Sequence, residues 1–173
     1  MQIRLESAKR IGRKIGLDDE KGYVVAVFLA LLIVSVTIIG YYVVLRPQAE
    51  PYNTIYLLDA NKKAVDYPLT LVANQNSTFS VYIGVENHLG ETASYQVQVK
   101  ITKNLPAIFP IDVQPSQVFE TGNVLDGKVW QNMATITENQ VGSYSVVFEL
   151  WQHKDGNLVF TQNYCVLNIQ VTN

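Results

Sequence analysis

Two hydrophobic patterns divide this chain. The first is an apolar run over residues 22–45, GYVVAVFLALLIVSVTIIGYYVVL, which has no charged side chain in 24 residues. Because an α-helix rises about 1.5 Å per residue, this run makes a helix about 36 Å long, enough to cross a hydrocarbon core of about 30 Å with some tilt. The pattern therefore predicts a transmembrane helix over residues 22–45.

A cleaved signal peptide is the competing interpretation of this run. The apolar region of a signal peptide has about 7–15 residues and is followed by a cleavage site of small residues. The run here is longer, and the RPQAE that follows it contains no such site. Tyr23 at one end and Tyr41 and Tyr42 at the other lie where an aromatic belt is expected. These observations favour a retained membrane anchor.

The second pattern begins after Pro47, where apolar and polar residues alternate with a period of two. Such alternation is typical of half-buried antiparallel strands. The clearest segments lie around residues 79–85, 95–101, 144–150 and 165–171, and weaker ones around 53–59, 65–72, 108–120 and 129–137. Seven or eight strands without a convincing helix predict an immunoglobulin-like antiparallel β-sandwich. A closed barrel is the alternative, but the uneven strand spacing favours the sandwich.

These patterns give four segments. We expect a basic tail over residues 1–21, the spanning helix over 22–45, a short stiff connector over 46–53, and a β domain over 54–173. A β domain of this size can bury a core of its own. It cannot contain an internal disulfide, because the chain has one cysteine.

Basic residues predict the orientation of the span. Six of them precede it, whereas only Arg46 follows it closely; the six are Arg4, Lys9, Arg10, Arg13, Lys14 and Lys21. By the positive-inside rule the N-terminus is cytoplasmic and the β domain extracytoplasmic. Residues 46–173 hold 7 basic and 11 acidic residues, a net charge of −4, which gives no reason to expect nucleic acid as a partner.

The basic tail has two interpretations that the sequence leaves open. Leu5, Ala8 and Ile15 fall on one face at helical spacing, and basic residues surround them: Arg4, Lys9, Arg10, Arg13 and Lys14. This pattern fits an amphipathic helix lying on the anionic lipids of the inner leaflet. The alternative is a frayed tail whose charges only set topology, because Gly12 and Gly16 weaken a helix.

The sequence contains no recognisable set of catalytic residues. The two histidines, His88 and His153, fall in predicted turns, where a weak surface metal site with nearby acidic residues is the only metal chemistry to consider. No glycine-rich phosphate loop, paired-cysteine motif or nucleophile elbow is present. Cys165 falls on the inward face of its strand and is expected to be a core residue. We expect a protein that is not an enzyme and uses no cofactor.

Asn76-Ser77-Thr78 is an N-glycosylation sequon in a predicted turn. Three-residue motifs occur by chance, but the predicted extracytoplasmic location raises the value of this one. We therefore expect Asn76 to be a glycosylation site.

Two groups of residues are candidates for protein contacts. Tyr82 and Trp151 fall on the polar side of their strands and are expected to be exposed, although strands favour aromatic residues in any case. In the span, Ala26, Ala30 and Gly40 are small enough to allow close packing against another helix. A lipid-facing helix with incidental small residues is the alternative.

The stretch from Asn76 to Gly90, NSTFSVYIGVENHLG, followed by the strand YQVQV at 95–99, resembles a known family. It is similar to the outer portion of archaeal membrane proteins of domain-of-unknown-function family 1616. The later segments Trp130–Thr137, Phe148–Leu150 and Leu167–Ile169 extend the resemblance over most of residues 53–171. The resemblance implies an archaeal source and a membrane-attached β domain outside the cell, and it carries no activity.

The sequence therefore predicts a non-catalytic single-pass membrane protein. Its β domain is expected to contact other integral membrane or envelope proteins as an accessory subunit of a hetero-oligomeric complex, beside membrane lipids as the other partner. The alternative is a surface module that binds a glycan or a metal at the turns around His88 and His153.

Overall fold

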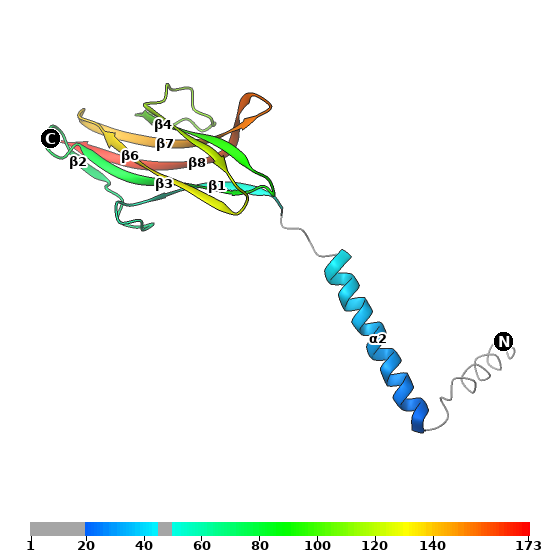
Figure 1. Ribbon diagram of the computed structural model, residues 1–173. Coiled ribbons are helices and arrows are strands. Elements are labelled where there is room, and N and C mark those ends of the chain that lie inside the picture. Colours follow the sequence, from blue (N-terminus) through cyan, green and yellow to red (C-terminus); the bar gives the residue numbers. More distant parts are fainter. Residues whose placement is uncertain (1–19, 45–49) are drawn as a thin grey trace. The chain divides into compact units, whose positions relative to one another are not determined.

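The computed structural model describes residues 20–44 and 50–173 (Figure 1). The chain forms two compact units, residues 1–49 and 50–173, each of which is described by itself. The first contains the helix α2, Glu20–Val44, which confirms the helix expected over 22–45. The tail residues expected at a membrane surface (Arg4, Lys9, Arg10, Arg13 and Lys14) lie outside the described residues.

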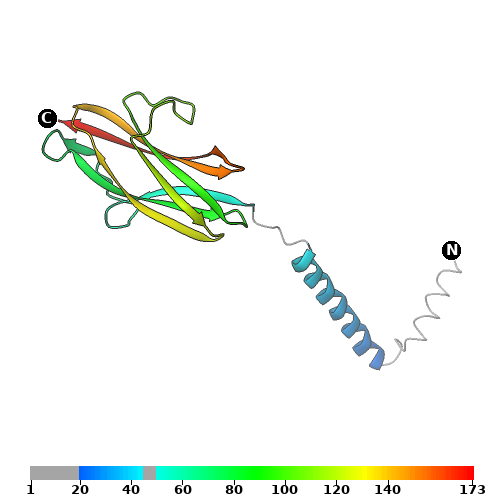
Figure 2. The same cartoon turned by 45° about the horizontal axis from the view of Figure 1, so that its top comes forward.

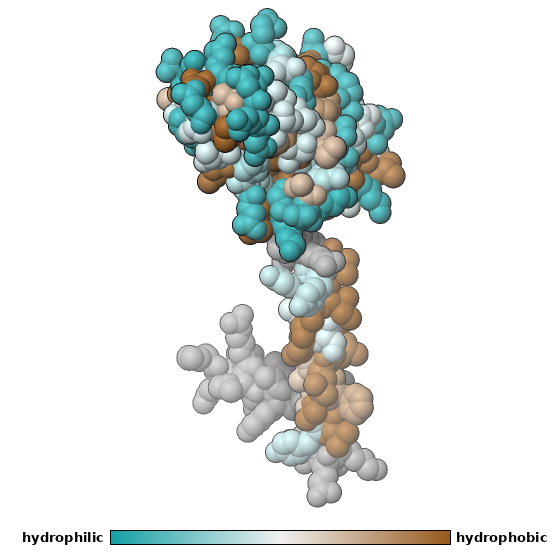
Figure 3. Space-filling model, turned by 90° about the vertical axis from the view of Figure 1, so that its left-hand side faces the viewer, coloured by the Kyte–Doolittle hydropathy of each residue, from teal (hydrophilic) through white to brown (hydrophobic). Residues whose placement is uncertain are grey.

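Helix α2 is apolar around its whole circumference. Every side chain from Tyr23 to Ile39 is exposed, and Figure 3 colours the helix mostly brown with some pale patches, in contrast to the mostly teal and white β domain. The Thr37 hydroxyl is satisfied within the helix, because its Oγ1 donates to the carbonyl of Ile33 at 2.7 Å. The segment Gly22–Val43 is long and apolar enough to cross a membrane.

The second unit is a β domain of two sheets. Sheet A has the strand order β1-β3-β6, and sheet B the order β2-β8-β7-β4-β5. The strands are β1 Tyr52–Leu58, β2 Thr70–Val72, β3 Thr78–His88, β4 Ala93–Thr102, β5 Gln117–Val124, β6 Lys128–Thr137, β7 Gly142–Lys154 and β8 Asn157–Thr172. Strand β1 includes the last two residues of the connector expected over 46–53.

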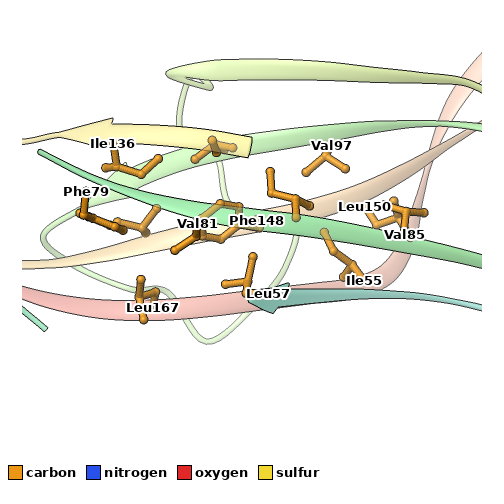
Figure 4. Packing of buried hydrophobic residues seen from close by; sticks show 14 of the residues in the cluster. Ile55, Leu57, Phe79, Val81, Val85, Val97, Ile136, Phe148, Leu150 and Leu167 are labelled. Atoms are coloured by element: carbon orange, nitrogen blue, oxygen red, sulfur yellow. The ribbon is translucent and has the colours of Figure 1, made fainter. Parts of the chain in front are cut away.

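The inner faces of the two sheets enclose one hydrophobic core (Figure 4). Sheet A contributes alternate residues such as Val81, Ile83 and Val85, and sheet B contributes residues such as Val97 and Phe148, all of which are fully buried. The four strongly alternating segments of the sequence are all strands, β3, β4, β7 and β8. Period-two patterning therefore located the core correctly.

Two details of the expected fold were wrong. Sheet B is mixed, because β2 pairs parallel to β8 through Thr70↔Gln170 and its neighbours, whereas a wholly antiparallel fold was expected. The weak segments at 65–72 and 108–120 are mostly irregular: only Thr70–Val72 and the residues from Gln117 onward are extended in a ladder. Pro110 and Pro115 in the second segment cannot donate to a ladder, which explains its irregular path.

Candidate interaction surfaces

The outer face of sheet B is covered by the chain itself. Residues 103–116, the connection between β4 and β5, lie over the side of β4 and β7 that faces away from β1 and β3 (Figures 1 and 2). Beneath this loop Val147 is fully buried, and Ile111 of the loop is 2% exposed. A second, smaller apolar contact therefore lies outside the main core.

A buried ion pair fixes the loop to the sheet. Lys100 Nζ on β4 lies 2.7 Å from Glu149 Oε2 on β7, and both residues are buried. Each also bonds the backbone of the same loop residue: Lys100 Nζ donates to the Ile111 carbonyl at 2.8 Å, and the Ile111 N–H donates to Glu149 Oε1 at 2.6 Å. Because burying two charges is costly unless they are fully bonded, this arrangement holds Ile111 in one place.

Aromatic contacts and the loop end add to this attachment. The ring of Phe109 stacks on Tyr164 of β8 with centroids 3.7 Å apart. Trp151 Nε1 donates to Glu149 Oε2 at 3.3 Å, so the tryptophan belongs to the same buried network. At the end of the loop, the Ser116 N–H donates to the Val99 carbonyl at 2.8 Å.

The tip of the loop is apolar and exposed. Ile108 is 80% exposed, the highest value among the large hydrophobic residues that the structure describes, and Leu105 is 42% exposed. The segment between Asn104 and Ile111 contains no charged residue. An anchored base therefore presents an uncharged, apolar tip to solvent.

The outer face of sheet A, in contrast, is open. Cross-strand pairing places Leu58, Tyr82 and Met133 in one row and Tyr56, Gly84 and Gln131 in the next. Met133 on this face is 49% exposed. The face combines aromatic and apolar side chains with amide groups.

Tyr56 lies down on Gly84 of the neighbouring strand. A Cβ built on Gly84 would lie 2.1, 2.3 and 2.6 Å from the Cζ, Cε2 and Cε1 atoms of the ring. These nearly equal distances place the glycine against the ring face rather than its edge. The Tyr56 hydroxyl accepts a hydrogen bond from Gln131 Nε2 at 3.0 Å, which fixes the far end of the ring.

Two further aromatic contacts flank this ring. The Lys62 ammonium lies 4.9 Å from the centroid of the Tyr82 ring, a cation–π distance. Tyr52, which is 51% exposed, stacks on His88 with centroids 4.6 Å apart. Most of the aromatic side chains on this face are thus already engaged in a fixed orientation.

Side chains bond backbone groups along both outer strands of sheet A, more fully on β1 than on β6. Along β1, the carbonyls of Asn53, Ile55 and Leu57 accept hydrogen bonds from Asn163 Nδ2 (3.0 Å), Cys165 Sγ (3.4 Å) and the Tyr67 hydroxyl (2.7 Å), respectively. Along β6, Gln117 Nε2 donates to the Thr135 carbonyl at 2.6 Å, and Asn132 Oδ1 accepts from the Met133 N–H at 2.9 Å. Such capping disfavours the addition of a foreign strand.

The two predicted contact residues of the β domain lie on opposite outer faces. Tyr82 is on sheet A, and Trp151 is on sheet B in the network below the loop. Both are half-buried rather than exposed, because Lys62 and Glu149 contact them. The structure therefore does not join them into one surface.

The two histidines were expected in turns, and this was wrong: His88 ends β3, and His153 lies in β7. His88 Nε2 is 3.5 Å from Glu86 Oε2, and His153 Nε2 is 2.9 Å from Glu120 Oε2. Burial acts to raise the pKa of Glu120, but hydrogen bonds from Gln96 and His153 outweigh it and lower the pKa. Among residues 20–44 and 50–173, no group of three or more potential metal ligands occurs.

Cys165 is half-buried and packs against the core, as expected for an inward residue of β8. Burial raises the pKa of its thiol to about 11, so the reactive thiolate is scarce at neutral pH. Its role in the structure is to contact the free edge of β1.

For the remaining candidate residues, the structure gives a location and an exposure only. Asn76 lies in the turn between β2 and β3, where it is exposed and forms a bridge with Val72. Ala26 and Ala30 are exposed on α2, and Gly40 is partly exposed with open space beside it. Glycosylation at Asn76 and helix packing through the small residues stay predictions.

The sequence analysis did not single out the two charged residues that attach the loop to sheet B. Lys100 and Glu149 fall on the polar side of their strands, where solvent exposure is the ordinary expectation. A signal was present in Val146–Leu150, where apolar residues fill both parities around a single glutamate. That pattern indicates a strand buried on both faces, and hence a covering segment.

Comparisons with known proteins give only distant matches. No family model matches the chain, and no curated protein matches it. Among solved structures, the CARDB domain of a Pyrococcus furiosus protein, determined in complex with di-metal ions, has a TM-score of 0.48 and 14% identity, over 71% of this chain and 90% of that chain. A β-glucosidase from Listeria innocua in complex with glucose has a TM-score of 0.49 and 9% identity, over 73% of this chain and 17% of that chain.

Proposed function

We propose that this chain is a non-catalytic, single-pass membrane protein whose immunoglobulin-like β domain binds another protein of the membrane or envelope. In this proposal α2 is the anchor, the N-terminus is cytoplasmic and the β domain is extracytoplasmic. The exposed apolar circumference of α2 and the basic residues that precede it in the sequence support this orientation. The two facing sheets around one core support an immunoglobulin-like fold.

The observation that carries the contact role is the fixed loop over sheet B. Residues 103–116 form a long irregular connection, and irregular loops of this length are usually functional. The buried pair Lys100–Glu149 orders the base of the loop before any partner binds. Because binding then costs little further ordering, the exposed Ile108 is preorganised for insertion into an apolar socket.

We infer that the socket belongs to a protein rather than to the lipid bilayer. Anionic lipid surfaces attract basic segments, whereas the residues 46–173 carry a net charge of −4. Strand addition at the β1 edge of sheet A is disfavoured, because side chains already bond the carbonyls of that edge. The contact is therefore made by side chains of the loop, in a complex with an integral membrane or envelope partner.

The test is purification of the full chain from its native membrane in mild detergent. We expect the wild-type protein to elute in a larger complex, and Ile108→Asp to elute as a monomer, because the charge cannot enter an apolar socket. Val141→Asp is the matched control: Val141 is 50% exposed in the turn before β7 and should leave the complex intact. A wild-type protein that elutes as a lone monomer contradicts the proposal.

A further inference from the structure

The residue at position 84 is glycine because of the neighbouring Tyr56 side chain, and not because of its backbone conformation. It lies within the regular ladders of β3 with β1 and β6, and it is not among the residues with positive φ. A glycine in the middle of a strand costs about 0.5–1 kcal/mol relative to alanine, so its presence needs another reason. The reason is the Tyr56 ring, which occupies the place of a Cβ.

The result is a tyrosine whose ring is held flat against the sheet. One ring face rests on Gly84, and Gln131 holds the hydroxyl at 3.0 Å. Tyr56 is half-buried, as a ring with one covered face should be. Its other face is directed away from the core side of the sheet.

We propose that Tyr56, with Tyr82 and the polar groups beside them, is a binding site for a neutral oligosaccharide on the outer face of sheet A. The C–H groups on one side of a sugar ring carry partial positive charge and stack on the negative face of an aromatic ring. A tyrosine that anchors a protein interface inserts its ring into a pocket of the partner. Tyr56 is pinned to the sheet and cannot insert, whereas a flat sugar ring can stack on it.

The surroundings of Tyr56 suit the hydroxyl groups of a sugar. Tyr82 lies on the neighbouring strand in the adjacent row, within the range of diagonal contacts of about 7–8 Å. Thr54 and Glu86 form the row on the other side, and they offer a hydroxyl and a carboxylate. Ligand sites commonly combine an apolar surface with a few polar groups that fix orientation.

The charges on this face favour a ligand without net charge. Lys62 lies over Tyr82, and Glu86 lies beside His88 on the same strand. The opposite charges of Lys62 and Glu86 offset each other, so the face attracts neither a strongly anionic nor a strongly cationic ligand. This site does not depend on the loop of sheet B, so the two proposals can fail separately.

The experiment uses the full chain in a zwitterionic detergent that lacks a sugar headgroup. Cellohexaose, laminarihexaose, mannohexaose and chitohexaose are titrated separately by isothermal titration calorimetry. We expect at least one of them to bind the wild-type protein. Tyr56→Ala should then lower the affinity at least about tenfold, which corresponds to about 1.4 kcal/mol.

Three further variants separate stacking from a general loss of structure. Tyr56→Phe keeps the ring and should bind within about threefold of wild type. Gly84→Ala keeps Tyr56 but lifts its ring from the sheet, and it should lose affinity as Tyr56→Ala does. Val118→Ala on β5, a residue that is 48% exposed, is the control and should bind as wild type does. The proposal is overturned if no oligosaccharide binds the wild-type protein, or if Tyr56→Ala binds equally well.

Discussion

The two outer faces of the β domain differ in what covers them. On sheet B, a loop of the same chain lies over β4 and β7, and the pair Lys100–Glu149 is buried beneath it. On the outer face of sheet A, the side chain of Tyr56 lies over Gly84 instead. A charged residue on an outer face can therefore be a buried anchor on one sheet and a solvated group on the other.

This difference explains why the two faces suit different contacts. The covered face presents its loop tip, a protruding apolar group that fits a concave partner. The open face presents a broad, immobile ring that fits a flat ligand. Each feature rests on one local arrangement, so each can be broken by a single substitution.

The largest effect is expected from Glu149→Ala on the covered face. The substitution leaves the Lys100 ammonium buried without its partner and removes the acceptor of the Ile111 N–H. We expect the free energy of unfolding to fall by about 3–5 kcal/mol. Urea unfolding of the full chain in detergent, followed by tryptophan fluorescence, measures this, because both tryptophans lie in the β domain.

Two controls accompany this measurement. Glu86→Ala removes a glutamate from the open face, where its side chain is 32% exposed, and should cost less than about 0.5 kcal/mol. The double substitution Lys100→Met, Glu149→Leu should recover most of the stability, because it leaves no unpaired charge. Equal losses for Glu149→Ala and Glu86→Ala would show that the two faces do not differ in this respect.

A smaller effect is expected from Gly84→Ala on the open face. The new Cβ collides with the Tyr56 ring, which must rise from the sheet and lose its contact. Because the colliding atoms are at the end of a side chain that can move, we expect a loss of only about 1 kcal/mol. Chemical unfolding of the full chain gives the value.

The sign of the Gly84→Ala effect should reverse when the ring is absent. In a Tyr56→Ala background, alanine at position 84 meets no ring and should stabilise the strand by about 0.5–1 kcal/mol. The two positions are then coupled in a double-mutant cycle. A Gly84→Ala effect that is the same in both backgrounds would mean that the ring does not explain the glycine.

Much of this architecture follows from the period of the hydrophobic pattern. A continuous apolar run indicates a helix in lipid, and alternation indicates strands with one buried face, so α2 and the strands β3, β4, β7 and β8 were predictable. The parallel strand β2 was not, because three residues carry too little pattern. The position of β2 depends on its long-range pairing with β8, in which Thr70 lies opposite Gln170. No local sequence pattern encodes that pairing.

The outer faces were less predictable than the core for a physical reason. Alternation marks which residues point away from the core, but it does not tell whether a loop then covers them. Glu149 lies on the polar side of its strand and is nevertheless buried, because residues 103–116 fold back on it. Likewise, Tyr56 and Gly84 are 28 positions apart, and only the register of β1 with β3 brings them together.

The smallest effect concerns the turn that places Lys62 above Tyr82. The Asp59 carboxylate accepts hydrogen bonds from the backbone N–H groups of Lys63 at 2.6 Å and Asn61 at 2.9 Å. The bond from Lys63 is the main cause that holds the pKa of Asp59 below its usual value of 3.8. A carboxylate whose pKa is lower in the folded state stabilises the fold above its unfolded pKa, and this contribution is lost as the pH falls through the folded pKa.

Asp59→Asn removes the titrating group and keeps an oxygen that can accept the same bonds. We therefore expect the wild-type protein to be more stable than the variant at pH 7, by an amount that shrinks as the pH falls below about 4. Urea unfolding at pH 7, 4 and 3 measures the difference. A difference that does not change across this range would show that the charge of Asp59 does not hold the turn, and that the position of Lys62 over the open face has another cause.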